Sequence, residues 1–130
     1  MGASTRPLVQ KFGLKPAHKA VILHAPEHFT LGKVPAGVAL QKKLGSDFDF
    51  IVAFFEKAAD FKAELPKIKS AMKKSGMAWI CWMKGNKTDL SRDEIWRISE
   101  TKGLETVSSI SIDQDWSALK LMYPKAMRKD

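Results

Sequence analysis

Residues 78–90 read A-W-I-C-W-M-K-G-N-K-T-D-L, so an apolar, aromatic run passes directly into a loop with two lysines and then into a helix start. The run 77–83 has the length and composition of a buried strand. Ser91 or Asp89 can cap a helix over residues 91–102. A buried strand that leads through a polar loop into a helix is typical of α/β proteins, so this unit decides the class of fold.

The same pattern recurs on both sides of this unit. Near-continuous apolar runs predict two further buried strands, and apolar residues at helical spacing predict a helix before the strand 77–83. Because parallel strands need helical crossovers, the chain is predicted to form a Rossmann-like three-layer sandwich, with a mostly parallel sheet and a C-terminal antiparallel hairpin. The remaining predicted elements are helices over 4–14 (capped by Ser4 or Thr5) and 57–74, and strands over 19–25, 38–40, 48–55, 104–112 and 116–123.

Three local features carry more specific predictions. Pro66 lies inside the segment 57–74, where it predicts either a kink or a second helix that begins at Pro66. Gly76 is predicted to end this helix in the left-handed conformation. One face of the first hairpin strand is predicted to carry the alternating residues Leu104, Thr106, Ser108, Ile110 and Ile112.

The composition is that of a folded chain. Of the 130 residues, 45% are hydrophobic and 28% are charged, which predicts one domain over residues 1–130. Within it, we expect residues 1–5 to be partly disordered and residues 124–130 to form a basic tail. No apolar window reaches the roughly 18–20 residues of a membrane span, and the N-terminus lacks the apolar core of a signal peptide. With a single cysteine, Cys81, no intramolecular disulfide is available, so we expect a cytoplasmic protein without a membrane partner.

The formal net charge is +8, from 22 Lys and Arg against 14 Asp and Glu. The lysines are spread along the chain, as is typical of a solvated basic surface. Association with nucleic acid stays open as an alternative, and it predicts an affinity that falls steeply with salt concentration because counterions are released on binding.

Short motifs along the chain resemble a family of small bacterial proteins known only as a domain of unknown function. The resemblance covers residues 12–123, and that family is similar to a shortened class I methyltransferase core. It implies the fold but no activity, cofactor or catalytic residue. The motifs that carry it are L-K-P at 14–16, A-P at 25–26, F-D-F-I-V at 48–52, L-P at 65–66, G-M-A-W-I-C-W at 76–82, K-G and D-L within 84–90, G-L at 103–104 and W-S-A-L-K at 116–120.

The loops argue against an intact cofactor enzyme. A methyltransferase of this class needs a glycine-rich turn after its first strand and an acidic residue at the end of its second, and a dehydrogenase needs a similar turn. Here residues 24–29 read H-A-P-E-H-F, and Gln41-Lys42-Lys43 follow the second predicted strand. The segment 26–46 is also too short for two helical crossovers. We therefore expect neither an intact SAM-dependent methyltransferase nor an NAD-dependent dehydrogenase, and no cofactor. The order K-G-N-K-T at 84–88 is not that of a phosphate-binding loop.

Two further patterns suggest catalysis and are better explained without it. Residues 24–28, H-A-P-E-H, have the letter pattern of one class of zinc peptidases. That pattern binds zinc only when both histidines lie one turn apart on a helix, and Pro26 predicts that His24 lies outside such a helix. We treat the match as coincidental and expect no metal site. Cys81, in the middle of a strand, is expected to be a core residue rather than a nucleophile.

Open α/β sheets bind ligands at the C-terminal ends of their parallel strands, where three of the predicted loops meet. The interpretation is a non-catalytic, methyltransferase-like domain that binds a small anionic ligand or a protein partner there. A small enzyme with His24, Glu27 or Glu56 as acid or base stays as an alternative. Trp116 is expected to pack beneath the hairpin turn or to stack on a ligand. The candidate binding residues are His24, Pro26, Glu27 and His28 of the first loop, Glu56 of the second, and Lys84, Asn86, Lys87 and Asp89 of the third.

Overall fold

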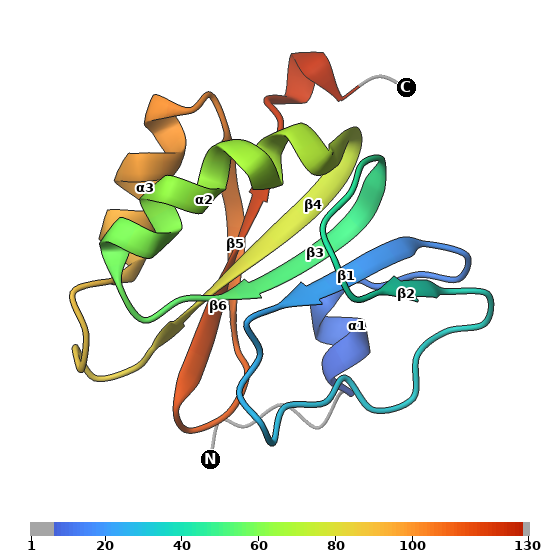
Figure 1. Ribbon diagram of the computed structural model, residues 1–130, viewed down its shortest axis with the longest axis horizontal. Coiled ribbons are helices and arrows are strands. Elements are labelled where there is room, and N and C mark those ends of the chain that lie inside the picture. The colour runs from blue at the N-terminus through green and yellow to red at the C-terminus, as the bar shows by residue number, and fades with distance from the viewer. Residues whose placement is uncertain (1–6, 129–130) are drawn as a thin grey trace.

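The computed structural model describes residues 7–128, and Figure 1 shows how the elements are arranged. The predictions for residues 1–5, including the caps Ser4 and Thr5, lie outside the described residues. No helix within the described range is both long and apolar enough to cross a membrane. In chain order the elements are α1 (Leu8–Phe12), β1 (Lys19–Leu23), β2 (Ala39–Gln41), β3 (Phe48–Phe54), α2 (Ala58–Ala71), β4 (Met72–Met83), α3 (Arg92–Thr101), β5 (Glu105–Ser111), β6 (Trp116–Met122) and the 3₁₀ turn η1 (Lys125–Met127).

The strands form a six-stranded sheet in the order β2-β1-β3-β4-β6-β5. The first four strands in this order run parallel, whereas β6 pairs antiparallel with both β4 and β5. In the register of the central strands, Ile51 of β3 lies opposite Val21 of β1 and Ala78 of β4. The predicted fold class is therefore confirmed, as a mostly parallel α/β sheet that closes with a C-terminal antiparallel pair.

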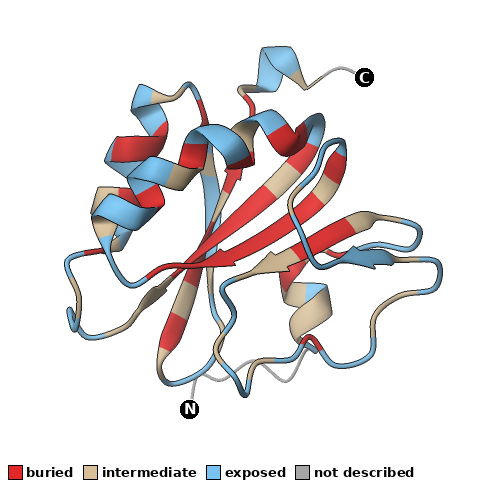
Figure 2. Ribbon diagram, viewed as in Figure 1, coloured by how far each residue is buried: buried red, intermediate tan, exposed pale blue. Residues whose placement is uncertain are grey.

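Two hydrophobic cores lie on the two faces of the sheet. α2 and α3 cover one face, and α1 with the loop after β1 covers the other (Figure 1). Strand residues alternate between the two cores, so Trp79 and Trp82 of β4 point to opposite faces as predicted. Figure 2 shows the buried residues concentrated in β3 and β4, while the edge strands β2 and β5 are mostly exposed.

The helix α2 is continuous from Ala58 to Ala71, with Pro66 inside it. The alternative of a second helix that begins at Pro66 is therefore wrong. A proline at this position leaves the carbonyl of Lys62 without its helical N–H donor. Both Pro66 and Lys62 are exposed, where water can supply that hydrogen bond.

Gly76 does not end α2, which is a correction to the sequence prediction. It is buried within β4, and its φ angle is not in the left-handed region. The strand begins at Met72 directly after the helix, five residues earlier than predicted. Glycine is needed here because the backbones of β3 and β4 approach closely. A Cβ atom at this position would lie 2.6 Å from the carbonyl oxygen of Phe48.

The prediction that alternating residues from Leu104 to Ile112 share one face of the first hairpin strand is also wrong. β5 contains an irregularity between Thr106 and Ser109, which pair with Leu121 and Leu119 of β6. β5 therefore has one more residue than β6 over this stretch, and an extra residue reverses the side-chain alternation beyond it. As a result Leu104 packs in the core beneath α2 and α3, while Ile110 packs on the opposite core.

The segment between β1 and β3 is short, as the sequence predicted. Between Leu23 and Phe48 the chain forms only the three-residue strand β2 and no helix. The connections on either side of β2 are loops, so the sheet ends at β2 without the helical crossovers that usually join parallel strands.

We predict that Asp49 stabilises the fold above about pH 4. Its Oδ2 accepts a hydrogen bond from the Lys19 N–H at 2.8 Å, and its Oδ1 lies 3.0 Å from Lys73 Nζ. Burial alone would raise the pKa of this carboxyl, but the Lys19 hydrogen bond and the Lys73 charge outweigh burial and lower the pKa below 3.8. A lowered folded-state pKa gives stability that is present above the unfolded pKa and is lost as the pH falls through the folded pKa.

Asp49→Asn should therefore cost about 1–2 kcal/mol in the free energy of unfolding at pH 7, because the charged partner of two hydrogen-bond donors is removed. The difference between variant and wild type should shrink below pH 3.8. Urea unfolding at a series of pH values measures it, and a difference that is constant from pH 7 to pH 3 would contradict the assignment.

Candidate functional site

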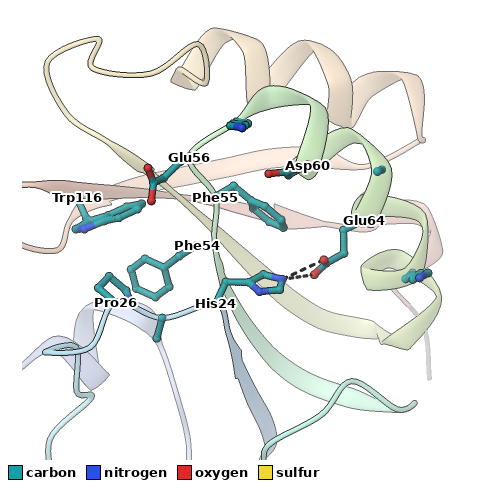
Figure 3. Close-up of a pocket in the computed structure, with 12 residues that line it drawn as sticks. His24, Pro26, Phe54, Phe55, Glu56, Asp60, Glu64 and Trp116 are labelled. Carbon is teal, nitrogen blue, oxygen red and sulfur yellow. Dashed lines mark hydrogen bonds and ion pairs between the residues drawn. The ribbon is translucent and has the colours of Figure 1, made fainter.

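A pocket of about 700 Å³ lies at the C-terminal ends of β1 and β3, beside the first half of α2 (Figure 3). From β1 the chain moves outward to β2, and β3 then returns on the other side of β1. The pocket is therefore at the point of the sheet where the direction of the strand order reverses, which is where open α/β sheets bind ligands. Its volume is in the range of small-molecule sites.

His24 and Glu64 form a pair on one side of the pocket. The Nε2 atom of His24 lies 2.9 Å and 3.0 Å from the two carboxylate oxygens of Glu64 (Figure 3). The His24 ring also packs at 5.5 Å on the ring of Phe55, the residue after β3. His24 itself has a φ of 58°, a left-handed conformation that is uncommon outside glycine. These contacts fix the imidazole at the C-terminal end of β1.

The wall formed by α2 and the loop before it carries charged side chains of both signs, with a small excess of carboxylates. Glu56, Asp60 and Glu64 all line the pocket, and they are spaced four residues apart along the chain. Because residues four apart lie on the same face of a helix, α2 presents Asp60 and Glu64 together. Lys57 and Lys67 also line the pocket. The wall thus carries three carboxylates and two ammonium groups. Ala63 is a small side chain on the same wall.

The opposite end of the pocket is aromatic. Phe54 contacts the ring of Trp116 edge-on at 5.1 Å and the ring of Phe29 at 4.8 Å. Trp116 begins β6, which runs antiparallel to β4, so its ring comes to the same edge of the sheet as the end of β3. Figure 3 shows Pro26, Phe54 and Trp116 at this end, with the carboxylate of Glu56 near the tryptophan.

The structure brings together three of the residues that the sequence singled out, His24, Pro26 and Glu56, in the lining of this pocket. Glu27 and His28, from the same first loop, are exposed and do not line it. The third loop contributes none of the lining residues, so Lys84, Asn86, Lys87 and Asp89 lie apart from the pocket wall.

The two lysines of the third loop face the hairpin β5–β6 instead. Lys84 Nζ donates to Ser111 Oγ at 2.6 Å, and the Lys84 N–H donates to the Asp115 carbonyl at 2.8 Å. Lys87 Nζ lies 3.9 Å from Asp115 Oδ1. Both lysines therefore lie against the hairpin, Lys84 through two hydrogen bonds and Lys87 through a long, exposed ion pair.

Asp89 and Ser91 cap different helices. Ser91 Oγ accepts from the Glu94 N–H and caps α3, which is one of the two predicted caps. Asp89 Oδ1 accepts at 2.9 Å from the N–H of Ala58, the first residue of α2. The third loop therefore supports the pocket indirectly, because it fixes the start of the helix that carries the charged wall.

We predict that Asp89→Ala destabilises the protein by about 1 kcal/mol, the usual cost of losing a side-chain cap. Asp89→Asn keeps an oxygen acceptor and should remain close to wild type. Thermal unfolding of the two variants side by side checks this prediction. An equal loss in both would show that the negative charge matters rather than the acceptor.

Neither metal chemistry nor thiol chemistry finds support in the described residues. Residues 24–28 do not form a helix, and within residues 7–128 no three His, Cys, Asp or Glu side chains gather as metal ligands. Cys81 is fully buried in β4, as predicted for a core residue. Burial, with a smaller contribution from the charge of Asp113, raises the pKa of its thiol, so it stays protonated at neutral pH.

Solved structures with the same fold include methyltransferases. A magnesium protoporphyrin IX methyltransferase from Synechocystis, with SAM bound, has 11% identity and a TM-score of 0.63, over 90% of this chain and 74% of that one. A TehB-like SAM-dependent methyltransferase from Corynebacterium glutamicum has 14% identity and a TM-score of 0.60, over 95% and 90%. One from Aquifex aeolicus has 14% identity and a TM-score of 0.60, over 89% and 87%. The chain therefore has a methyltransferase-like, Rossmann-like fold.

Within this class the chain belongs to a family described as "Protein of unknown function (DUF3052)", whose model matches residues 37–125. The resemblance to a family of unknown function is thereby confirmed. The matched segment contains Glu56, Asp60, Glu64 and Trp116 of the pocket, whereas His24 precedes it. No curated protein matches the chain.

Proposed function

We propose that the protein binds a small, flat organic ligand without net negative charge in the pocket between β1 and β3, and that it does so without methyl transfer. The observation that carries the proposal is the lining of a single pocket of about 700 Å³, with aromatic rings at one end and carboxylates along one wall. A nucleoside has the matching chemistry, since it combines a flat heteroaromatic base with hydroxyl donors.

The lining suits such a ligand better than the small anion that the sequence suggested. Carboxylates accept hydrogen bonds only, so Glu56 and Asp60 favour amino or hydroxyl donors and repel phosphate. Trp116 and Phe54 line the other end of the pocket, and although they are only 7% and 3% exposed, they make that end apolar. Lys57 and Lys67 bring the wall close to neutrality, which favours a neutral or zwitterionic molecule over a strong cation.

Methyl transfer is disfavoured by what surrounds the pocket. The turn after β1 contains Pro26 and no glycine, so a cofactor cannot approach the backbone as closely as glycine permits. No helix follows β1, so there is no helix N-terminus after this strand to meet a ligand. Lys42 and Lys43 follow β2 where a ribose-binding enzyme of this class has an acidic residue.

Thermal unfolding with added compounds tests the proposal. Adenosine should raise Tm by about 4 °C when present at ten times Kd, because binding to the native state stabilises it by about 1.4 kcal/mol. Inorganic phosphate should raise Tm less. A rise with phosphate but none with adenosine would contradict the proposal and favour an anion site.

A matched pair of variants assigns the effect to the pocket. Ala63 lines it, whereas Ala59, one helical turn earlier, is also exposed and does not. Ala63→Phe should fill the pocket and abolish the rise in Tm, and Ala59→Phe should retain it. Loss of the rise in both variants, or in neither, would argue against binding at this position.

Acid–base catalysis is a second candidate, because the His24–Glu64 pair borders the same pocket. It predicts that a compound that binds is also converted, and that Glu64→Gln slows the conversion. Mass spectrometry after prolonged incubation of adenosine with the protein measures this directly. Recovery of unchanged adenosine would exclude its conversion.

A further inference from the structure

Basic residues that are spread along the sequence come together at one end of the fold. The C-terminal end of α2, the start of β4, the end of α3 and η1 all lie at this end of the molecule (Figure 1). None of the basic residues there lines the pocket between β1 and β3. We name them the Tyr123 cluster, after the ring that they surround: Lys69, Lys74, Lys102, Lys125 and Arg128.

Tyr123 brings several of these cations close together. The ammonium group of Lys74 lies 4.5 Å from the centroid of the Tyr123 ring, and that of Lys69 lies 5.7 Å from it. The Tyr123 hydroxyl donates to the Lys69 carbonyl at 2.9 Å, and Arg128 Nε donates to the Tyr123 carbonyl at 2.7 Å. Lys69 Nζ also donates to the Lys102 carbonyl at 2.6 Å. Contacts between distant parts of the chain therefore hold the cluster in place.

Few carboxylates balance this charge. Glu105 lies 2.8 Å from Arg128 Nη2, whereas the four lysines of the cluster form no ion pair with any carboxylate within residues 7–128. Burial, with a smaller contribution from the charge of Arg128, lowers the pKa of Lys120 on β6. The field of the cluster thus acts on another cation nearby. Cations that lie close together without balancing carboxylates attract anions.

The shape of this surface favours an extended anion over a small one. None of the side chains of the cluster lines the pocket between β1 and β3 or the two smaller hollows beside α3 and β5. A small ligand is usually held in a concave site that encloses most of its surface. Cations distributed over an open surface instead match the repeated charges of a polyanion.

The composition of the surface favours nucleic acid over a membrane or an acidic protein. Of the four large hydrophobic side chains that are exposed among the described residues, only Met127 belongs to the segments that carry the cluster. Binding at a membrane surface uses a face of tryptophan, phenylalanine or leucine next to the cations. Protein interfaces have an apolar core in which lysine is depleted. A phosphodiester backbone requires cations and no apolar face.

We propose that the Tyr123 cluster binds the phosphodiester backbone of nucleic acid without selecting a base sequence. The lysine ammonium groups contact phosphate oxygens. Tyr123 is only 6% exposed, so it positions Lys69 and Lys74 rather than stacking on a base. Contacts to phosphate give affinity and carry no sequence information directly. The surface shares no residue with the lining of the pocket between β1 and β3, so the two sites act independently.

Fluorescence anisotropy of the full chain with a DNA duplex of about 20 base pairs, and with a single-stranded RNA of the same length, tests the proposal. At about 50 mM salt we expect binding, and the logarithm of the affinity should fall with the logarithm of salt concentration with a slope of about −3 for the duplex, because each phosphate contact contributes about −0.9. The tighter of the two complexes identifies the nucleic acid.

A charge-matched pair of double variants assigns the binding to the cluster. Lys74→Gln with Lys125→Gln should weaken binding at least about tenfold and reduce the magnitude of the slope by about 2. Lys42→Gln with Lys43→Gln is the control. It removes the same charge from exposed positions that follow β2, at the opposite edge of the sheet from the β6–β5 pair, and it should bind like wild type.

Salt-dependent binding that the cluster variant weakens more than the control variant supports the proposal. The absence of binding to both nucleic acids at about 100 μM protein overturns it, as does an equal loss in the two double variants, which would reflect net charge alone. Tighter binding to phosphatidylserine vesicles or to poly-glutamate also overturns it, in favour of a membrane or an acidic protein. Far-UV circular dichroism checks folding. Lys125→Gln alone, with a slope reduced by about 1, is the substitute if the double variant does not fold.

Discussion

Replacing Trp79 with alanine is expected to lower the free energy of unfolding by about 3–5 kcal/mol, the range for deletion of a buried aromatic side chain. Trp79 is 1% exposed in β4, and its ring contacts Phe12 edge-on at 5.3 Å. Its indole Nε1–H donates at 2.9 Å to the carbonyl oxygen of Phe12, the last residue of α1. The substitution therefore opens a cavity and leaves a buried acceptor without its donor. Urea unfolding measures the loss.

Trp79→Phe separates the two contributions. It retains an aromatic ring next to Phe12 but removes the indole N–H. A smaller loss of about 1–3 kcal/mol is expected, because an unsatisfied buried carbonyl carries most of that cost. It also provides a measurable variant if Trp79→Ala does not fold. A loss below about 0.5 kcal/mol for Trp79→Ala, as found for surface substitutions, would contradict the described packing of α1 on the sheet.

Gly76→Ala is expected to destabilise the protein by about 2–4 kcal/mol, although it adds one methyl group. That methyl group would lie 2.6 Å from the Phe48 carbonyl oxygen and 3.2 Å from the Lys73 carbonyl oxygen, and both atoms belong to the backbone. The crowding follows from the pairing of β3 with β4. Phe48 pairs with Met72 and Phe50 with Met77, so β4 bulges where Gly76 passes the start of β3.

Gly45→Ala is the matched control for Gly76→Ala. A Cβ atom at Gly45 would meet a ring carbon of Phe48 at 4.0 Å, an ordinary contact distance, and its φ angle is not positive. Thermal unfolding of the two variants should show a large loss at position 76 and little change at position 45. Equal stability of the two variants would mean that the strands are farther apart at Gly76 than described.

Much of the fold could be predicted from local sequence pattern. The buried strands β1, β3 and β4, the helix α3 with its Ser91 cap, and the terminal hairpin each depend on residues that are close in the chain. The errors arose where residues that are far apart in the chain determine where an element begins or ends. α2 ends at Ala71 without a glycine, and Tyr123, 54 residues away from Lys69, donates its hydroxyl to the Lys69 carbonyl near that end.

The site was harder to predict than the fold. The sequence identified His24, Pro26 and Glu56, because each follows the C-terminal end of a predicted strand. It missed Asp60 and Glu64, although the spacing of Glu56, Asp60 and Glu64 at four-residue intervals was a usable signal for a shared face. The partnership of His24 with Glu64, 40 residues away, follows only from the position of α2 over the sheet.

The lysines of the third loop, which the sequence placed among the binding residues, lie away from this pocket. Lys84 and Lys87 resemble an anion site in sequence, because they follow a strand and precede a helix. In the structure both face the β5–β6 hairpin, a contact that depends on β6 lying next to β4. That adjacency reverses the chain order of β5 and β6, and no local pattern specifies it.

The most direct test of a ligand site between β1 and β3 is a titration with adenosine followed by the indole N–H resonances of the four tryptophans. Trp116 lines the pocket, Trp79 is buried beneath α1, and neither Trp82 nor Trp96 lines the pocket. We predict that the Trp116 resonance moves and saturates with adenosine while the other three stay in place. A Trp116 resonance that stays unmoved at millimolar adenosine, or movement confined to Trp82 and Trp96, would contradict the account.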